Sequence, residues 1–136
     1  MQPVSLPVEE FTTPDPIMVT QDTALDEIQM LIEKSGVRHL PVVGNNQVVG
    51  IISDRDLRFY SGLSDAEKYQ ITAADIMSPD PLTVSCSTPL DQVAFLMSER
   101  KVGSAIVIEE DNDQLYGIFT ATDALNALVE LVRQAN

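Results

Sequence analysis

The 136-residue chain has few of the residues that commonly serve in active sites and metal sites: it contains one cysteine, one histidine and no tryptophan. With Cys86 alone, neither an internal disulfide nor a cysteine-based zinc site can form, and we interpret this residue as an ordinary small residue in a loop. The lone histidine, His39, is interpreted as a packing or hydrogen-bonding residue, because general-base catalysis would also need a nucleophile or a bound water beside it. No nucleophile, base pair or metal cluster is visible, so the sequence predicts no enzyme and no metal site.

Basic residues are also scarce: 8 Lys and Arg stand against 21 Asp and Glu, for a formal net charge of −13. This balance opposes binding to nucleic acid backbones and to anionic lipid. Long apolar runs are absent, and the Met1–Val4 segment lacks the charged and apolar regions of a signal peptide, so we expect a cytoplasmic protein without a membrane anchor. The acidic run Glu109–Asp113 lacks the glycine and distal glutamate of a calcium-binding EF-hand loop and is interpreted as a solvated hairpin tip.

An internal repeat organises what is present. Pro16–Thr20 falls on Pro81–Ser85, 65 residues later, and the match continues through the following helix. After a two-residue insertion, Gly50–Ser53 falls on Gly117–Thr120. These matches show that two copies of one unit fill the chain. Hydrophobic residues make up 44% of the chain and charged residues 21%, which is ordinary for a folded domain.

Each copy begins with a short strand, at about Met18–Thr20 in the first, which leads into an amphipathic helix. A threonine with an acid three residues later predicts a hydroxyl N-cap at the start of both helices, and a glycine predicts the end of the first. In the second copy a proline is expected at the first helical position. These signals are Thr23, Asp26 and Gly36 in the first copy and Thr88, Pro89 and Asp91 in the second.

Two β-rich runs and a further helix complete each copy. In the first, Gly44-Asn45-Asn46 predicts a hairpin turn. The predicted strands are 39–43 and 47–53 in the first copy and 104–108 and 115–119 in the second, and the predicted final helix is 121–133. The pattern of each copy is thus β-α-β-β-α, a mixed α/β (α+β) fold.

The boundaries follow from the repeat and from composition. We expect an N-terminal lead segment at 1–13, a first repeat at 14–60, a polar linker at 61–70 and a second repeat at 71–136, which opens with a short helical lead at 71–77. Because so small a unit cannot bury both its sheet and its helices alone, the two copies are expected to pack about a pseudo-twofold axis. The clefts between them are then the predicted site.

With these residues in view, the chain resembles a known family, the tandem cystathionine-β-synthase (CBS) domain pair or Bateman module. The resemblance covers roughly residues 14–133 and depends on several short segments that occur twice in the same order. They are Val37–Val43 and Gly50–Leu57 in the first copy, and Ala74–Met77, Pro81–Val84, Met97–Ser104 and Gly117–Leu125 in the second.

The resemblance implies a regulatory module that senses AMP, ADP, ATP or S-adenosylmethionine in the clefts between repeats and controls an attached or separate partner. It implies no required cofactor, since the adenosyl ligand acts as an effector. The hydroxyls of Ser53 and Thr120 would contact phosphate, and Asp56 and Asp123 would contact the ribose. The residues that would border the base are Met18, Thr20, His39 and Pro41 in the first copy and Thr83, Ser85, Ser104 and Ile106 in the second.

The same spacing has a second interpretation. Ser53 with Asp56, and Thr120 with Asp123, also match the capping box, in which the two side chains satisfy backbone N–H groups at a helix start. A carboxylate at this place can equally accept ribose hydroxyls, as an acid does in dinucleotide-binding folds. The sequence leaves both interpretations open.

The basic residues distinguish the two copies. Six of the eight lie near the strand-to-helix joints or the end of each first helix: Lys34, Arg38, Arg55, Arg58, Arg100 and Lys101. Cations at helix ends complement the macrodipole, but Arg55 stands at a predicted helix start, so we predict that it meets a phosphate. The second copy has Thr122 at this position, and its site should suit a nucleoside or an uncharged tail.

A competing hypothesis is a structural interaction protein whose clefts stay empty and whose helices bind a partner or a second copy. The predicted final helix carries an apolar stripe at Leu125, Leu128, Val129 and Val132, which must pack on something. We therefore expect a disc-like homodimer through this stripe and the matching faces of the first helices.

Overall fold

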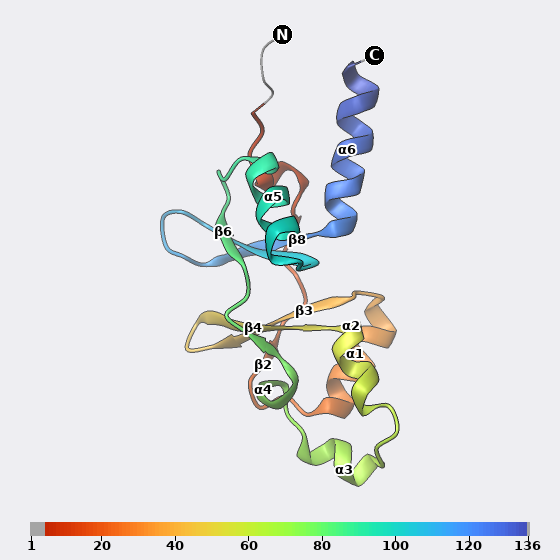
Figure 1. Ribbon diagram of the computed structural model, residues 1–136. Helices are drawn as coiled ribbons and strands as arrows, with labels where there is room; N and C mark the ends of the chain where they lie inside the picture. Colours follow the sequence, from red (N-terminus) through yellow and green to blue (C-terminus); the bar gives the residue numbers. More distant parts are fainter. Residues whose placement is uncertain (1–4, 136) are drawn as a thin grey trace. The chain divides into compact units, whose positions relative to one another are not determined.

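The computed structural model describes residues 5–135, so Met1–Val4, the segment compared with a signal peptide, lies outside the described residues. The chain divides into two compact units, and Figure 1 shows the elements of each. The first-repeat unit comprises Pro16–Pro81. The second-repeat unit comprises the described residues up to Asp15 together with those from Leu82 onward.

The first-repeat unit is a mixed four-stranded sheet with helices. Its strands lie in the order β2-β3-β4-β5, of which β2 and β3 are parallel and the other neighbours antiparallel. Its elements are β2 (Val19–Thr20), α1 (Leu25–Ser35), β3 (His39–Gly44), β4 (Gln47–Ser53), α2 (Asp54–Leu57), the 3₁₀ turn η2 (Arg58–Tyr60), α3 (Asp65–Gln70), α4 (Ala73–Ile76) and β5 (Ser78–Pro79).

The second-repeat unit has the same sheet, in the order β1-β8-β7-β6, with β6 and β7 parallel. Its elements are η1 (Val8–Phe11), β1 (Thr13–Pro14), β6 (Thr83–Ser85), α5 (Leu90–Arg100), β7 (Ser104–Ile108), β8 (Leu115–Thr120) and α6 (Ala121–Ala135). The predicted β-α-β-β-α pattern is confirmed in both copies. The pseudo-twofold packing and the clefts stay predictions.

Each sheet is completed by a segment that precedes the other repeat in the sequence. The lead segment η1-β1 pairs with β8 of the second repeat, and the corresponding segment α4-β5 pairs with β4 of the first. Matching backbone bonds hold both: the Val8 N–H donates to the Thr88 carbonyl, and the Ala73 N–H donates to the Thr23 carbonyl, both over short distances. The described part of the predicted 1–13 lead thus belongs to a core, and α3 occupies the second half of the predicted linker.

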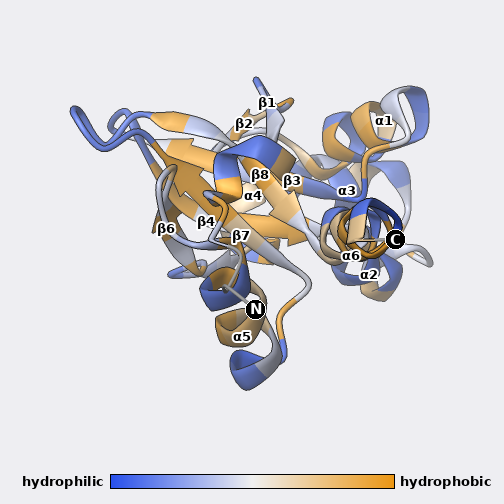
Figure 2. Ribbon diagram, turned by 90° about the horizontal axis from the view of Figure 1, so that it is seen from above, coloured by the Kyte–Doolittle hydropathy of each residue, from blue (hydrophilic) through white to orange (hydrophobic). Residues whose placement is uncertain are grey.

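Alternation along the strands builds the two cores. Leu40, Val42 and Ile52 pack against the inner face of α1, and their counterparts Ala105, Val107 and Phe119 pack against α5. Val8 of the lead segment is fully buried in the second core. Figure 2 shows the resulting concentration of apolar residues in the central strands.

The predicted N-caps at Thr23 and Thr88 are wrong. The helices begin one residue later than those signals indicated, at Leu25 and Leu90, and neither N-cap residue, Ala24 or Pro89, makes a side-chain cap bond. The threonine hydroxyls instead accept the N–H groups of Thr20 and Ser85, at 3.1 and 3.2 Å. Proline at 89 is therefore the N-cap residue and not the first helical one.

The two helix starts do not use these caps because backbone carbonyls of the segments that precede the two repeats accept their first N–H groups. The Leu25 N–H donates to the Ile71 carbonyl at 2.9 Å, and the Leu90 N–H donates to the Leu6 carbonyl at 2.7 Å. A helix start whose N–H is paired by tertiary structure has less need of a side-chain acceptor.

The predicted turn of the first copy is confirmed. Asn45 and Asn46 connect β3 to β4 as a two-residue loop, and both adopt the left-handed region, with φ of 52° and 63°. Two consecutive positive φ angles match the twist of antiparallel strands, and asparagine tolerates them. Gly36, with φ of 74°, ends α1 as expected.

Two matched glycines allow the lead segments to be tested. A Cβ on Gly117 would collide with the backbone carbonyl of Thr13 in β1, whereas a Cβ on Gly50 would meet only the flexible side chain of Met77. We expect Gly117→Ala to lower the free energy of unfolding by about 1–3 kcal/mol and Gly50→Ala to cost less. Urea unfolding of both variants measures this, and equal losses would contradict the close approach of β1.

Candidate functional site

The two strand-to-helix joints, β4 into α2 and β8 into α6, have the same hydrogen bonds. The Ser53 N–H donates to Asp56 Oδ2 at 2.9 Å, and the Asp56 N–H donates to Ser53 Oγ at 3.2 Å. The Thr120 N–H donates to Asp123 Oδ2 at 2.9 Å, and the Asp123 N–H donates to Thr120 Oγ1 at 3.3 Å. The capping interpretation of both pairs is confirmed.

The correspondence extends to the strand before each joint. The Asp54 N–H donates to the Arg38 carbonyl at 2.9 Å. The Ala121 N–H donates to the Gly103 carbonyl at 3.0 Å. Across the strands His39 pairs with Ser53, and Ser104 pairs with Thr120. The six matching positions of each joint are Arg38, His39, Ser53, Asp54, Arg55 and Asp56 in the first-repeat unit, and Gly103, Ser104, Thr120, Ala121, Thr122 and Asp123 in the second.

One hydrogen bond differs between the joints. Thr120 Oγ1 donates its own hydrogen to Asp123 Oδ2 at 3.0 Å. Ser53 Oγ accepts from the Asp56 N–H, and within residues 5–135 it donates to no acceptor. The Ser53 hydroxyl hydrogen is therefore available to a ligand.

The inner strands place the site residues of each unit on one face of its sheet. Residues that alternate with the core positions lie on the face away from the core. These are His39, Pro41 and Ser53 in the first-repeat unit and Ser104, Ile106 and Thr120 in the second. Pro41 and Ile106 have almost no exposed surface, so their predicted place beside a base stays a prediction.

The first strands end in polar turns that hold the remaining site residues. Thr20 Oγ1 donates to Asp22 Oδ1 at 2.7 Å, and this bond lowers the pKa of the Asp22 carboxyl. Ser85 makes a similar turn with the Thr88 hydroxyl. Thr83 pairs with Ile106 across the parallel strands, and Met18, just before β2, is exposed.

Charge at the first joint centres on His39. This imidazole is half-buried, and burial lowers its pKa below the ordinary 6.5, while Asp54 and Asp56 oppose the shift and Arg38 adds to it. His39 is therefore neutral at pH 7. Arg55 is exposed at the start of α2, as its sequence position predicted.

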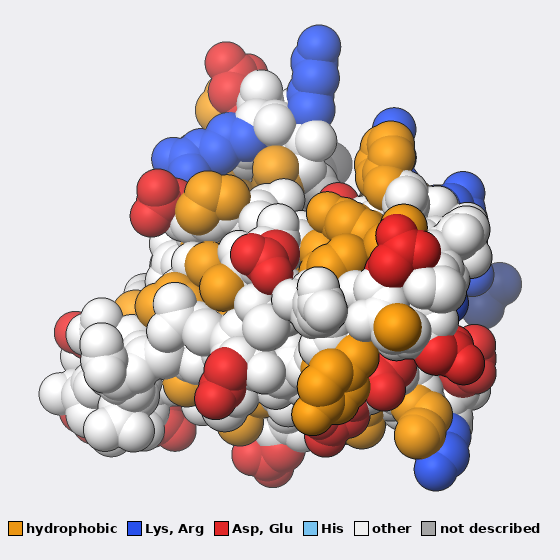
Figure 3. All heavy atoms as spheres, turned by 90° about the horizontal axis from the view of Figure 1, so that it is seen from below, with side chains coloured by type: hydrophobic (Ala, Val, Ile, Leu, Met, Phe, Trp, Pro, Cys, Tyr) orange, Lys and Arg blue, Asp and Glu red, His pale blue; other side chains and the backbone are white. Residues whose placement is uncertain are grey.

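Figure 3 shows how widely the acidic side chains are spread over one face of the molecule, among apolar and neutral ones.

The sequence alone did not lead us to pair Arg38 with Gly103 or Asp54 with Ala121, although the structure places both pairs at the two joints. Arg38 was noted only as one of several basic residues near a joint. The repeat offset contained the signal, because the residues on either side of each pair were already aligned. A comparison of charge at every aligned position would have found both.

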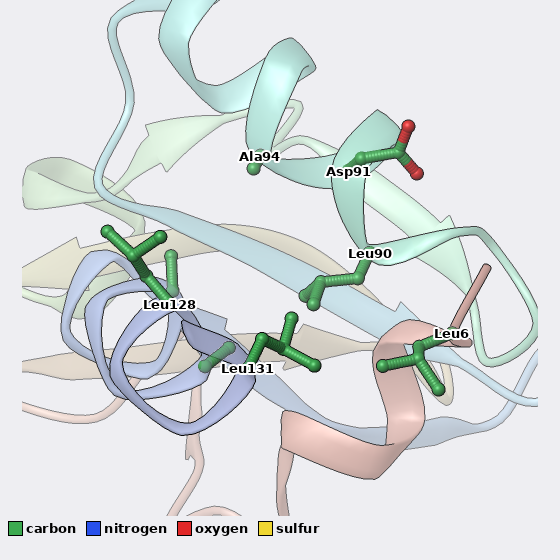
Figure 4. Close-up of a pocket in the computed structure, with 8 residues that line it drawn as sticks. Leu6, Leu90, Asp91, Ala94, Leu128 and Leu131 are labelled. Atoms are coloured by element: carbon green, nitrogen blue, oxygen red, sulfur yellow. The ribbon is translucent and has the colours of Figure 1, made fainter. Parts of the chain in front are cut away.

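An apolar groove lies in the second-repeat unit, between the lead segment, α5 and α6. It has a volume of about 210 Å³. Figure 4 shows Leu90 and Leu131 pointing toward each other across it, while Asp91 points away. Its lining residues are Leu6, Leu90, Asp91, Ala94, Ala124, Ala127, Leu128 and Leu131. Leu128 also belongs to the exposed stripe of α6.

Other chemistry finds little support in the described part of the chain. Residues 5–135 hold no group of three or more His, Cys, Asp or Glu side chains placed to bind a metal ion. Cys86 lies in the second core, and burial raises the pKa of its thiol, which makes it a poor nucleophile. None of the helices in residues 5–135 has the length and apolar character needed to cross a membrane.

Comparison with known proteins matches the family model described as CBS domain twice, at residues 8–62 and 73–130. Among curated relatives, inosine-5'-monophosphate dehydrogenase from Korarchaeum cryptofilum is 30% identical over 115 residues, which cover 85% of this chain and 23% of that enzyme. The chain thus spans less than a quarter of the length of the curated relatives it matches.

Solved structures match over nearly the whole chain. CBSX2, a CBS-pair protein from Arabidopsis thaliana that was crystallised with AMP, is 28% identical with a TM-score of 0.79, covering 92% of this chain and 97% of its own. AcuB from Vibrio cholerae is 27% identical with a TM-score of 0.80, covering 96% of this chain and 95% of its own.

The lowered pKa of His39 predicts a pH dependence of stability. Just below pH 6.5 the unfolded chain binds a proton that the folded chain does not, so the free energy of unfolding falls as the pH drops through this range and is retained above it. His39→Ser, which installs the residue found at 104, should remove this contribution. Denaturant unfolding above and below pH 6.5 measures it, and an equal decline in both proteins would contradict the assignment.

Proposed function

Because the chain belongs to the CBS domain family, we propose that it is a regulatory module that binds an adenosine-containing ligand, AMP, ADP, ATP or S-adenosylmethionine, at its two strand-to-helix joints. The observation that carries the proposal is the duplicated hydroxyl and carboxylate pair, Ser53 with Asp56 and Thr120 with Asp123. Support comes from CBSX2, whose match covers 92% of this chain and which was solved with AMP.

Capping and ligand binding are compatible at these carboxylates. Each cap uses only one oxygen, Oδ2 of Asp56 and Oδ2 of Asp123. Within residues 5–135, neither Oδ1 accepts a hydrogen bond, so each is available to a ribose hydroxyl. A carboxylate fixed by its cap is pre-oriented, which reduces the entropy lost when the ligand binds.

The role that we propose is regulatory and not catalytic, with the adenosyl ligand as effector, no resident cofactor and a cytoplasmic location. The dehydrogenase relatives support this, because the matched residues form a small part of those enzymes. The regulated protein is then either a separate partner or further sequence attached to the module. A purely structural module with empty sites is the competing hypothesis.

We also propose a homodimer through α6. The apolar stripe of this helix is 46–63% exposed and consists of Leu125, Leu128, Val129 and Val132. Under the offset that relates Asp56 to Asp123, the matching residues of the first repeat are polar or lack a side chain: Arg58, Ser61, Gly62 and Asp65. Only the second repeat carries the apolar face, so α6 of one copy should pack on α6 of the other. The spacing of the stripe reads the same in both directions, which suits a twofold interface.

Asp56→Ala and Asp123→Ala test the ligand proposal by isothermal titration calorimetry with AMP, ATP, adenosine and S-adenosylmethionine. Each change removes a ribose acceptor, so we expect a weakening at one of two sites by about 1–3 kcal/mol, about fivefold to 150-fold. Both changes also remove a cap and should cost some stability.

Asp75→Ala is the matched control, since Asp75 caps α4 through Thr72 with the same bonds as Asp123 makes to Thr120, at 2.9 and 3.1 Å. It should lose stability and keep its affinity for ligand. Wild-type protein that binds none of the four compounds would refute the proposed function and favour the structural alternative.

Leu128→Glu tests the dimer, because it puts a charge at the centre of the apolar stripe. We expect the variant to sediment as a monomer at concentrations where the wild type is a dimer. Ser61→Glu, at the matching position of the first repeat, is the control and should stay dimeric. A monomeric wild type at tens of micromolar would contradict the proposal.

A further inference from the structure

The two joints share a backbone but differ in charge, and we propose that they divide the ligand accordingly: the first-repeat joint binds a phosphate-bearing nucleoside, and the second-repeat joint binds an uncharged nucleoside. This inference rests on the proposed function and names the chemical class that each joint takes.

Three of the matching positions hold a basic residue in the first-repeat joint and an uncharged one in the second. Arg38, His39 and Arg55 correspond to Gly103, Ser104 and Thr122. Because the backbone bonds and strand pairs at these positions are the same, the side chains depart from equivalent places. The difference therefore lies in side-chain chemistry and not in the course of the chain.

Acidic neighbours reduce this difference without removing it. In the first-repeat joint Asp54 and Asp56 offset Arg38 and Arg55, so the formal charge is zero with His39 neutral. In the second-repeat joint Asp123 is the only charged residue of the six matching positions, and the formal charge is −1. A phosphate thus approaches a neutral site in one unit and an anionic site in the other.

Hydrogen-bond donors follow the same division. Phosphate oxygens only accept hydrogen bonds when ionised, so a phosphate site needs side chains with hydrogens to give. The Ser53 hydroxyl has no acceptor within residues 5–135, and the Arg55 guanidinium is exposed. The Thr120 hydroxyl already donates to Asp123.

The helix dipole favours phosphate at the second-repeat joint instead, but this effect is weaker than the difference in side-chain charge. α6 has 15 residues and α2 only 4, so the positive end of α6 has the stronger field. That field is equivalent to about half an elementary charge and falls on the Asp123 carboxylate, which neutralises it. The difference of one full formal charge between the joints, zero in the first and −1 in the second, outweighs it.

The test compares AMP and adenosine as probes at one joint at a time. Asp123→Ala weakens the second-repeat joint so that the first dominates the binding, and Asp56→Ala does the reverse. By calorimetry at low salt, we expect the Asp123→Ala protein to bind AMP at least about fivefold more tightly than adenosine. The Asp56→Ala protein should show the reverse order. Added salt should reduce the preference for AMP, because it screens the exposed guanidinium.

Exchange of the arginine gives the second arm. Arg55→Thr in the Asp123→Ala background should lower the ratio of AMP to adenosine affinity severalfold, and Thr122→Arg in the Asp56→Ala background should raise it. If the wild type binds neither probe, the proposed function and this inference both fail. If both probes bind but the two joints show the same ratio, or the reverse order, only the division by charge is overturned.

Discussion

The reciprocal backbone pairing of the two lead segments is the constraint on which the rest of the structure depends. Leu6 and Ile71 supply the carbonyls that receive the first N–H groups of α5 and α1, and β1 and β5 complete the two sheets. The second-repeat unit is not a continuous stretch of sequence, because β1 of its sheet lies before the first repeat. Since a lost edge strand and an unpaired helix start both cost stability, each unit depends on its lead segment to complete its fold.

Duplication also explains why the joints are so alike. The residues that set the backbone, a hydroxyl on the last strand and an acid three positions later, are kept in both copies, because they pair N–H groups at the helix start. Positions whose side chains point to solvent, such as Arg55 and Thr122, are not needed for the fold and are free to differ. The fold thus keeps the backbone of the two joints alike while leaving the charge of their exposed side chains free to differ.

The sequence predicted the parts of the fold that depend on local signals. The repeat offset, the strand alternation and the Asn45-Asn46 turn all led to the observed elements. The predicted caps at Thr23 and Thr88 failed because residues distant in sequence, Leu6 and Ile71, pair the helix N–H groups instead. A backbone acceptor that is distant in sequence cannot be predicted from a pattern of four consecutive residues. For the candidate site, the capping boxes were predictable, but the availability of the Ser53 hydroxyl and of each Oδ1 required the geometry.

The segment that follows the last strand differs between the two repeats, and this difference links the proposed assembly to the proposed choice of ligand. Where the second repeat continues as the 15-residue helix α6, the first turns through η2 into α3, so its matching face is polar. The exposed apolar stripe and the joint with a formal charge of −1 therefore fall in the second-repeat unit, and the joint with two arginines and a formal charge of zero falls in the first. Under the two proposals, the second-repeat unit self-associates and the first-repeat unit holds the phosphate site, a division of roles that two identical repeats could not provide.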